Sequence, residues 1–514
     1  MDEFVDEARV IITNDQLTFH QRKHYLAALA ENALPYPEIS DDAAEAMNKG
    51  VVDDLFEGHA PYRPRYILPD YELALRQGSE HLDLDAPTDL DEALNFLLIL
   101  YTQVPSITGF PVFLGDIDSL LLPYTTDVSD ADLRSKLRLF WLALDRILPD
   151  GFVHANIGPD DNRVLWTILD IERELLQIVP NLSLKVDPER TSDDVLMNAI
   201  EAVFATAKPH FVNHTMMVDD LGPNYGVVSC YNSLKQGGGA HTLVRLNLKE
   251  AVLNHSGTSD EFLDRTLPRY AGFTADVMAA RIRFLVEEAR FFEHDFLARE
   301  GLVRLDRFSA MFGVYGLAEA VNLLMDHRGS DSRYGDGGEA DELSYRIVGA
   351  LSEFVATYDM PYCEGGGGHA FLHSQSGIDS DVEVTAGTRI PIGAEPETFQ
   401  HIMTVAPHHQ HFPAGVSDIF HIDETARNNP DAMVDMIRGA FATGMRDFTF
   451  NLDSNDFVRI TGYLVRKSEL ARYSEGNERH SSTVFAAGSV ANSHVTDRAV
   501  KRVLIREHSP RPPQ

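Results

Sequence analysis

Cysteine is scarce in this chain of 514 residues, which contains only Cys230 and Cys363. Two cysteines are too few for a disulfide scaffold, for a four-cysteine zinc site or for a complete set of iron–sulfur cluster ligands. Any cysteine chemistry in this protein must therefore be done by one or two thiols.

Basic residues are also few, because 44 lysines and arginines stand against 79 aspartates and glutamates, a formal net charge of -35. A field of that sign repels phosphate backbones and anionic membrane surfaces, so we expect no nucleic-acid partner and no membrane partner. Long apolar runs are missing, and the N-terminus is acidic where a signal peptide has positive charge. The sequence therefore predicts a cytoplasmic protein.

What the sequence does contain is helical and β-type patterns in alternation. Apolar residues recur at helical spacing in four segments, which are 131–151, 191–209, 260–300 and 343–357. Runs of β-type composition occur in five segments, which are 209–249, 381–393, 401–407, 447–453 and 457–465. Strands mixed with long helices predict an α/β fold, and no repeat or low-complexity linker divides the chain. We expect one large α/β domain with a helical N-terminal layer.

The last of these runs contains the motif RITGY at 459–463. Apolar and polar residues alternate around it as in a half-buried strand, and Gly462 interrupts the alternation. An isolated glycine in a strand usually marks a bulge, a bend or the close approach of another backbone.

RITGY resembles the Arg-Val-Ser/Thr-Gly-Tyr signature of glycyl radical enzymes, which lies in the same C-terminal region of that family. Together with RYILPDY at 65–71 and HSQSGIDSDVEVTAGTRIPIG at 373–393, it makes the chain similar to the YjjI family of glycyl radical enzymes over most of its length. The resemblance implies a ten-stranded α/β barrel like that of pyruvate formate-lyase and anaerobic ribonucleotide reductase. It assigns the helical layer, barrel and cysteine loop to residues 1–440 and the glycyl radical region to 441–514, and it implies a homodimer.

The resemblance also implies roles for two residues. Gly462 would store the radical, which suits glycine because no Cβ hinders a planar arrangement of the α-carbon with the flanking amide and carbonyl. Cys230 would receive the radical, and its thiyl form would take a hydrogen atom from the substrate. Cys230 follows an apolar run and precedes a glycine-rich turn, as expected of a strand that leads into a loop. The remaining members of the radical loop would be Arg459, Thr461 and Tyr463.

A partner protein is implied as well. In the family, a separate radical-SAM activating enzyme holds the iron–sulfur cluster and S-adenosylmethionine, so we expect no cofactor and no metal bound to this chain. Because another protein cannot reach a buried glycine, we expect the segment around 455–467 to swing out for activation.

Departures from better-known relatives narrow the chemistry. Ser229 stands where pyruvate formate-lyase has a second cysteine, so acyl transfer of that kind is not expected. Asn232 stands where diol- and choline-cleaving relatives have a glutamate, and an amide cannot act as a general base. Two cysteines also cannot build the four-cysteine zinc site of anaerobic ribonucleotide reductases. We expect a lyase or a reductase that acts on a small polar molecule, which the sequence does not identify.

Other candidates rest on residue type alone. The residues that we predict to line a substrate pocket are Cys363, Glu364, His373, Asn232 and His408. Four carboxylates are candidate general bases, namely Glu364, Asp379, Asp381 and Glu383. The sequence gives no distance between any of them and Cys230.

Two alternatives stay open. One is a metal-dependent hydrolase whose ligands come from His408, His409, His411 and His421, with positions 409 and 411 on one side of a strand. The other is a non-catalytic relative that keeps the barrel as a binding module.

Overall fold

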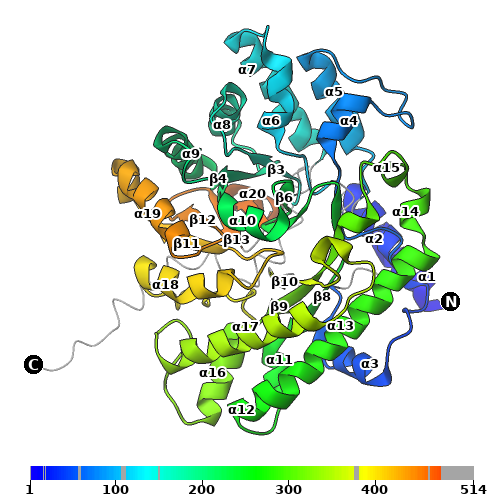
Figure 1. Ribbon diagram of the computed structural model, residues 1–514, viewed down its shortest axis with the longest axis vertical. Coiled ribbons are helices and arrows are strands. Elements are labelled where there is room, and N and C mark those ends of the chain that lie inside the picture. Colours follow the sequence, from blue (N-terminus) through cyan, green and yellow to red (C-terminus); the bar gives the residue numbers. More distant parts are fainter. Residues whose placement is uncertain are drawn as a thin grey trace, which may run out of the picture.

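The computed structural model describes residues 2–14, 17, 19–55, 59–105, 111–148, 151–375, 381, 383–460 and 463–475. Within these residues, ten strands form two sheets of five strands each, and helices cover the outer faces of both sheets (Figure 1). This arrangement confirms the α/β fold that the sequence predicts.

The first sheet has the order β1–β8–β9–β10, and β2 also pairs with β8. Strands β8, β9 and β10 are parallel, whereas β1 and β2 run antiparallel to β8. The bounds are β1 Val52–Asp53, β2 Tyr66–Leu68, β8 Gly238–Asn247, β9 Phe308–Tyr315 and β10 Phe371–Ser374. The helices drawn over this sheet in Figure 1 are α11 Leu248–Leu253, α13 Leu267–Arg283, α16 Leu317–His327 and α17 Glu339–Thr357.

The second sheet has the order β11–β12–β5–β4–β3. Strands β3, β4 and β5 are parallel, and β12 is antiparallel to β5 but parallel to β11. The bounds are β3 His154–Ile157, β4 Asn181–Val186, β5 His210–Asn213, β11 Asp418–Ile422 and β12 Asp447–Leu452. The helices outside it in Figure 1 are α7 Asp130–Ile147, α8 Arg163–Leu175, α9 Asp193–Thr206, α18 Thr398–His409 and α19 Pro430–Ala442.

The N-terminal part of the chain is a helical layer, as predicted. Besides α7, it consists of α1 Asp2–Thr13, α2 Phe19–Asn32, α3 Asp41–Asn48, α4 Tyr71–Gln77, α5 Leu90–Tyr101 and α6 Ile117–Leu121. Shorter helices elsewhere are α10 His214–Leu221, α12 Ser259–Glu261, α14 Phe291–His294, α15 Phe296–Arg299 and α20 Lys467–Ser474. No helix in the described part of the chain has the length and hydropathy needed to cross a membrane.

The predicted helix signals act locally as expected. Ser129 caps α7 by accepting a hydrogen bond from the Asp132 amide, and Ser192 caps α9 by accepting one from the Val195 amide. The apolar stripe of α7 is buried at Leu133, Leu137, Phe140 and Leu144, while Ile147 at the helix end is exposed. Of these helices, α9 packs on β12 of the second sheet, while α7 packs on α8, which lies between it and α9.

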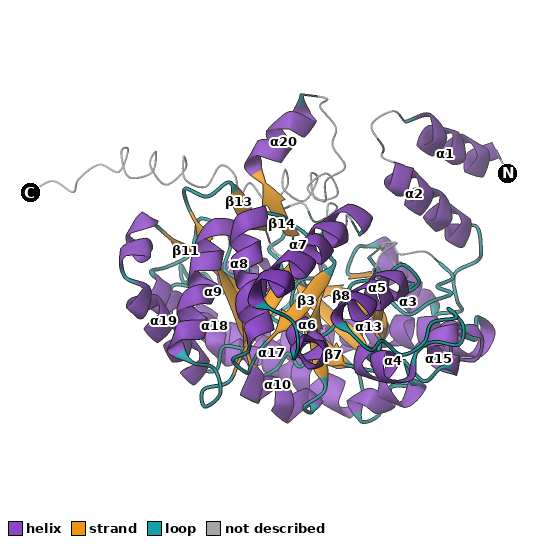
Figure 2. Cartoon of the chain, turned by 90° about the horizontal axis from the view of Figure 1, so that it is seen from above, coloured by secondary structure: helices purple, strands orange, loops and turns teal. Residues whose placement is uncertain are grey.

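Two antiparallel hairpins complete the described fold. The first joins β6 (Tyr225–Val228) to β7 (Asn232–Lys235), and the second joins β13 (Phe457–Ile460) to β14 (Tyr463–Arg466). Because β6 contacts β3 and β7 contacts β8, the first hairpin lies between the two sheets. Figure 2 shows β13, β14 and α20 on the side of the molecule where α1 and α2 also lie.

Two strand predictions are wrong, and a third segment forms two strands where one was expected. Residues 401–407 belong to helix α18, in which buried residues recur at helical spacing at 401, 402, 405 and 406. The described part of 381–393 is a loop, tied to its surroundings by bonds such as that from the Gly316 amide to the Thr385 carbonyl. The described residues of 457–465 are β structure, as predicted, but they belong to two paired strands, β13 and β14, instead of one.

Candidate active site

Cys230 lies at the tip of the β6–β7 hairpin. The last paired residues are Val228 and Asn232, so Ser229, Cys230 and Tyr231 form the turn. Ser229 adopts a left-handed conformation, with φ at 61°, and only 2% of Cys230 is exposed. The Cys230 Sγ lies 3.6 Å from the Ser229 Oγ. The hairpin thus presents a buried thiol between the two sheets.

Polar side chains from the second sheet hold one side of this hairpin. The Asn156 amide group of β3 both donates to the Val227 carbonyl (2.7 Å) and accepts from the Val227 amide (2.8 Å). The Ser229 carbonyl accepts from Asn181 Nδ2 (3.1 Å) and lies 3.0 Å from His154 Nδ1. Burial lowers the pKa of His154, so the ring is neutral and its Nδ1–H donates to this carbonyl. The backbone beside Cys230 is therefore fixed by three side chains.

The first sheet holds the other side. The Tyr231 hydroxyl donates to the Ser374 carbonyl at the end of β10 (3.0 Å), and its ring lies 5.8 Å from the His373 ring. His373 Nδ1 lies 3.0 Å from the Ala414 carbonyl, and burial lowers the pKa of His373 to about 3. His373 is therefore a neutral side chain close to the cysteine turn, and its place in a substrate pocket stays a prediction.

The β13–β14 hairpin approaches the same place. Residues 461–462, which join its strands, lie outside the described residues, so the predicted positions of Thr461 and Gly462 have no structural test here, and the Tyr463 side chain is likewise not described. Arg459, two residues before Thr461, is completely buried, and its backbone exchanges two hydrogen bonds with the Asn451 side chain of β12 (2.9 and 2.8 Å).

Asn181 links the two hairpins. Its Oδ1 accepts from Arg459 Nη2 (2.9 Å), while its Nδ2 donates to the Ser229 carbonyl (3.1 Å). One asparagine of β4 therefore contacts both the backbone beside Cys230 and the arginine of RITGY. The structure thus brings together the cysteine turn and the strand that leads into the RITGY turn, although 229 residues separate Cys230 from Arg459 in the chain.

Several predicted pocket residues lie elsewhere or have another task. Asn232 is buried, but its amide donates to the Val228 carbonyl within the hairpin (3.1 Å). Cys363 and the exposed Glu364 belong to a loop that packs at the start of β9, whereas the cysteine turn contacts the end of β10. Burial raises the pKa of the Cys363 thiol. Since β9 and β10 are parallel, Cys363 and Cys230 lie toward opposite ends of these strands.

The predicted histidine cluster does not form. His408 is buried between α17 and α18, where its Nε2 lies 3.1 Å from the Ser344 Oγ. His409 contacts Asp418 (3.2 Å), and His421 contacts Asp453 (3.1 Å). His411 lies in the turn after α18, so positions 409 and 411 do not share a strand face. Among the described residues, no three His, Cys, Asp or Glu side chains are placed to hold a metal ion.

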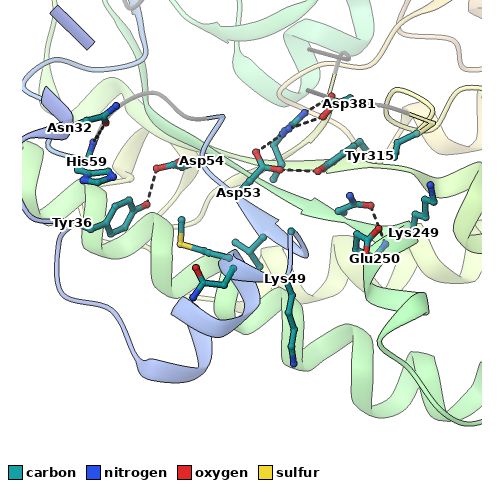
Figure 3. Close-up of a pocket in the computed structure, with 17 residues that line it drawn as sticks. Asn32, Tyr36, Lys49, Asp53, Asp54, His59, Lys249, Glu250, Tyr315 and Asp381 are labelled. Carbon is teal, nitrogen blue, oxygen red and sulfur yellow. Dashed lines mark hydrogen bonds and ion pairs between the residues drawn. The ribbon is translucent and has the colours of Figure 1, made fainter. Parts of the chain in front are cut away.

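The structure places two of the remaining candidate general bases, and neither contacts the cysteine turn through the hydrogen bonds and ion pairs of the described residues. Asp381 makes a two-pronged ion pair with Arg245 (2.7 and 3.0 Å), Glu383 is exposed, and Asp379 lies outside the described residues. Arg245 and Asp381 line a hollow of about 630 Å³ (Figure 3), in which Arg245 also pairs with Asp53 (2.8 Å) and Tyr315 donates to Asp53 (2.8 Å). Three of the acids labelled in Figure 3, Asp53, Asp54 and Asp381, thus bond through their carboxylates to neighbouring side chains, and nothing in this hollow identifies a ligand.

The functional residues that the sequence analysis missed are polar positions in buried strands. Asn156, Asn181 and His154 belong to β3 and β4, two strands that the sequence analysis did not predict, and all three bond to the cysteine hairpin. Arg389 lies 5.4 Å from the centre of the Tyr231 ring. An isolated polar residue in a buried strand is the signal that was available, since such a group needs a partner inside the fold.

Comparison with known proteins decides the family. The family described as glycyl radical enzyme YjjI-like matches residues 17–501. The chain belongs to this family of glycyl radical enzymes. It is 46% identical to the YjjI protein of Escherichia coli (strain K12) over 504 residues, which are 98% of this chain and 96% of the relative. The recognition made from RITGY and the two longer stretches is thereby confirmed.

Solved structures support the same fold. A glycyl radical enzyme from Archaeoglobus fulgidus matches this glycyl radical enzyme with a TM-score of 0.66 at 13% identity, covering 94% of this chain and 86% of its own. The anaerobic ribonucleotide reductase from Thermotoga maritima, with glycerol in its active site, matches with a TM-score of 0.66 at 13% identity, covering 93% and 87%. The two five-stranded sheets are therefore the ten-stranded α/β barrel of these enzymes, as predicted.

Proposed function

We propose that Gly462 stores the radical of this enzyme and that Cys230 takes it over to react with the substrate. In the first step the Cys230 S–H bond breaks, and its hydrogen atom forms a C–H bond at the Gly462 α-carbon. The resulting thiyl radical then takes a hydrogen atom from a C–H bond of the substrate and leaves a substrate radical. After rearrangement, the product radical takes the hydrogen atom back from the Cys230 thiol, and the thiyl radical then recovers a hydrogen atom from Gly462. The cycle therefore needs no external oxidant or reductant if the reaction is that of a lyase.

The link through Asn181 is the observation that supports this proposal most directly. Arg459 lies three residues before Gly462, and Asn181 bonds both to it and to the carbonyl that precedes Cys230. A hydrogen atom moves only between groups in near contact, so the two turns must face each other. The burial of Cys230 supports the same role, because a thiyl radical needs protection from water and oxygen.

The substrate remains a small polar molecule in this proposal, and the reaction an elimination, a cleavage or a reduction. The cysteine turn offers neither a second cysteine at position 229 nor a carboxylate at position 232. Asn232 donates to the hairpin itself, which argues against its direct action on substrate.

The proposal includes a partner and an assembly. A separate activase with an iron–sulfur cluster and S-adenosylmethionine would remove a hydrogen atom from Gly462, and the chain would work as a homodimer in an anaerobic cytoplasm. Activation requires residues 455–467 to move away from the body. Asn451 and Asn181 bond to Arg459, so these contacts would have to break and reform.

An electron paramagnetic resonance spectrum tests the class of chemistry. The full chain is activated anaerobically with its activase, and wild type, Gly462→Ala and Cys230→Ala are compared. We expect a glycyl doublet in wild type and in Cys230→Ala, none in Gly462→Ala, and chain cleavage at residue 462 after exposure to air. Absence of a doublet in wild type, with an activase that binds the chain and consumes S-adenosylmethionine, contradicts the proposal.

A further inference from the structure

Two buried arginines near the cysteine turn line one small cavity. Arg459 is fully buried and Arg389 is 9% exposed, and both border a cavity of about 40 Å³. A cavity of that size has room for roughly three water molecules, or for one small polar group. The other lining residues include Asn451, Asp418 and Ile460.

Both arginines have N–H groups that find no hydrogen-bond acceptor among the described residues. Arg459 Nη2 donates to Asn181 and to the Ala207 carbonyl (3.1 Å), but its Nε and Nη1 have no hydrogen-bond acceptor among the described residues. Arg389 Nε donates to the Ser417 carbonyl (2.8 Å), and its Nη2 has no acceptor in the described structure. Buried polar groups are normally hydrogen-bonded, so three unsatisfied nitrogens beside one cavity indicate that something else binds there.

Neither arginine is engaged in an ion pair with a neighbouring carboxylate of the described residues. In the described part of the chain, neither arginine has a carboxylate oxygen within 4.0 Å. Asp418 is shared by His401 and His409, and Asp447 lies 2.8 Å from His210. Burial raises the pKa of Asp447 to about 7, so this group compensates only part of the charge, and burial lowers the pKa of Arg459 to about 9.

The two arginines connect to the residues on either side of Cys230. The Arg389 guanidinium lies over the Tyr231 ring, one residue after Cys230, and Arg459 is joined through Asn181 to the carbonyl of Ser229, one residue before it. Cys230 itself does not line the cavity, but both guanidinium groups that would bind a ligand there connect to residues next to it.

We propose that Arg389 and Arg459 bind the carboxylate group of the substrate, so that the substrate of this enzyme is a small carboxylic acid. A planar monoanion fits the cavity and accepts from guanidinium N–H groups with favourable geometry. Asp418 and Glu395 line the same cavity, and their negative charge disfavours a phosphate dianion. The identification of this ligand as the substrate rests on the proposed function. Its binding can be measured without forming the radical.

Calorimetric titration of the full, unactivated chain tests it with matched pairs of probes. Lactate and glycerate are compared with the uncharged lactamide and glycerol, and inorganic phosphate is titrated separately. We expect the carboxylates to bind at least tenfold more tightly than their neutral partners and than phosphate. Equal binding within each pair, no binding of either acid, or tighter binding of phosphate overturns the proposal without requiring any variant.

Substitutions then locate the site. Arg389→Gln should weaken lactate or glycerate binding at least tenfold, and Arg459→Lys should weaken it while keeping a positive charge. The control is Arg304→Gln, because Arg304 is largely exposed and pairs with Asp306. Unchanged binding in folded Arg389→Gln, or an equal loss in the control, contradicts the assignment.

The glycyl radical test is independent of this one. A glycyl doublet in a wild-type chain that binds no carboxylate would refute the anion site and leave the proposed function intact. Carboxylate binding by a chain that never forms the doublet would refute the proposed function.

Discussion

Replacement of Asn181 by alanine should uncouple the two hairpins. It removes the hydrogen bond to the Ser229 carbonyl and the charge-assisted bond from Arg459, both buried. A neutral buried hydrogen bond contributes about 1 kcal/mol and one to a charged group about 1.5–3 kcal/mol, so we expect Asn181→Ala to lower the free energy of unfolding by about 2–4 kcal/mol.

The effect on radical transfer is the decisive part. In D2O the Cys230 thiol exchanges its hydrogen for deuterium. When this thiol passes deuterium to Gly462 and then takes back the original hydrogen atom, the α-hydrogen of the glycyl radical is replaced by deuterium. The doublet, which arises from coupling to that α-hydrogen, then collapses. Small displacements of reacting groups lower rates by up to about a hundredfold, so we expect this collapse to slow at least tenfold in Asn181→Ala.

A matched control separates positioning from stability. Asn322, on the outer helix α16, accepts a hydrogen bond from the Tyr334 amide (2.9 Å), so Asn322→Ala also loses a hydrogen bond but lies outside the barrel. Its exchange rate should equal that of wild type. If Asn181→Ala is destabilised but exchanges at the wild-type rate, Asn181 only supports the fold and the argument for coupled hairpins is wrong.

Three further predictions concern other buried groups. Cys230→Ala should abolish the exchange of the Gly462 α-hydrogen in D2O while keeping the doublet, whereas Cys363→Ala should leave this exchange unchanged. Loss of the exchange in Cys363→Ala would refute the assignment of Cys230 as the thiol that takes over the radical. Lys208 and Glu172 form a fully buried ion pair (2.7 Å), so Lys208→Met should lower the free energy of unfolding in urea by about 3–5 kcal/mol, and adding Glu172→Gln should recover part of the loss. Burial lowers the pKa of His408 from 6.5 to about 3, so the folded state binds fewer protons there than the unfolded chain. Stability from this group is complete above pH 6.5 and is lost as pH falls toward 3, and His408→Gln should reduce the slope of unfolding free energy in that range; an unchanged slope contradicts the assignment.

Local pattern explains why some predictions succeed. The motif at 459–463 and the position of Cys230 depend on residue identity and order, which sequence records directly, and the family comparison confirms the recognition. Helices such as α7 and α9 follow from an apolar stripe and a serine cap, both short-range properties. The strand prediction for 401–407 failed because a short apolar run suits a strand or a buried helix equally well. Packing against neighbouring elements such as α17 and β11 decides between the two.

The site itself depends on distance across the barrel. Four histidines within 14 residues looked like one ligand set. In the structure, helix α18 directs His408 to Ser344 and His409 to Asp418, whereas strand β11 directs His421 to Asp453. Arg389 gave no local signal, because its unsatisfied N–H groups are visible only when the surrounding acceptors are placed.

By itself, the sequence determined the enzyme family, the α/β class and the two residues proposed to exchange the radical, since each is encoded in residue type and order. Only the tertiary structure decided that Asn181 joins the hairpins and that two arginines face one cavity near the thiol. These facts depend on contacts between strands far apart in the chain, such as β4, β6 and β13, and such contacts leave no periodic trace in the residues between them.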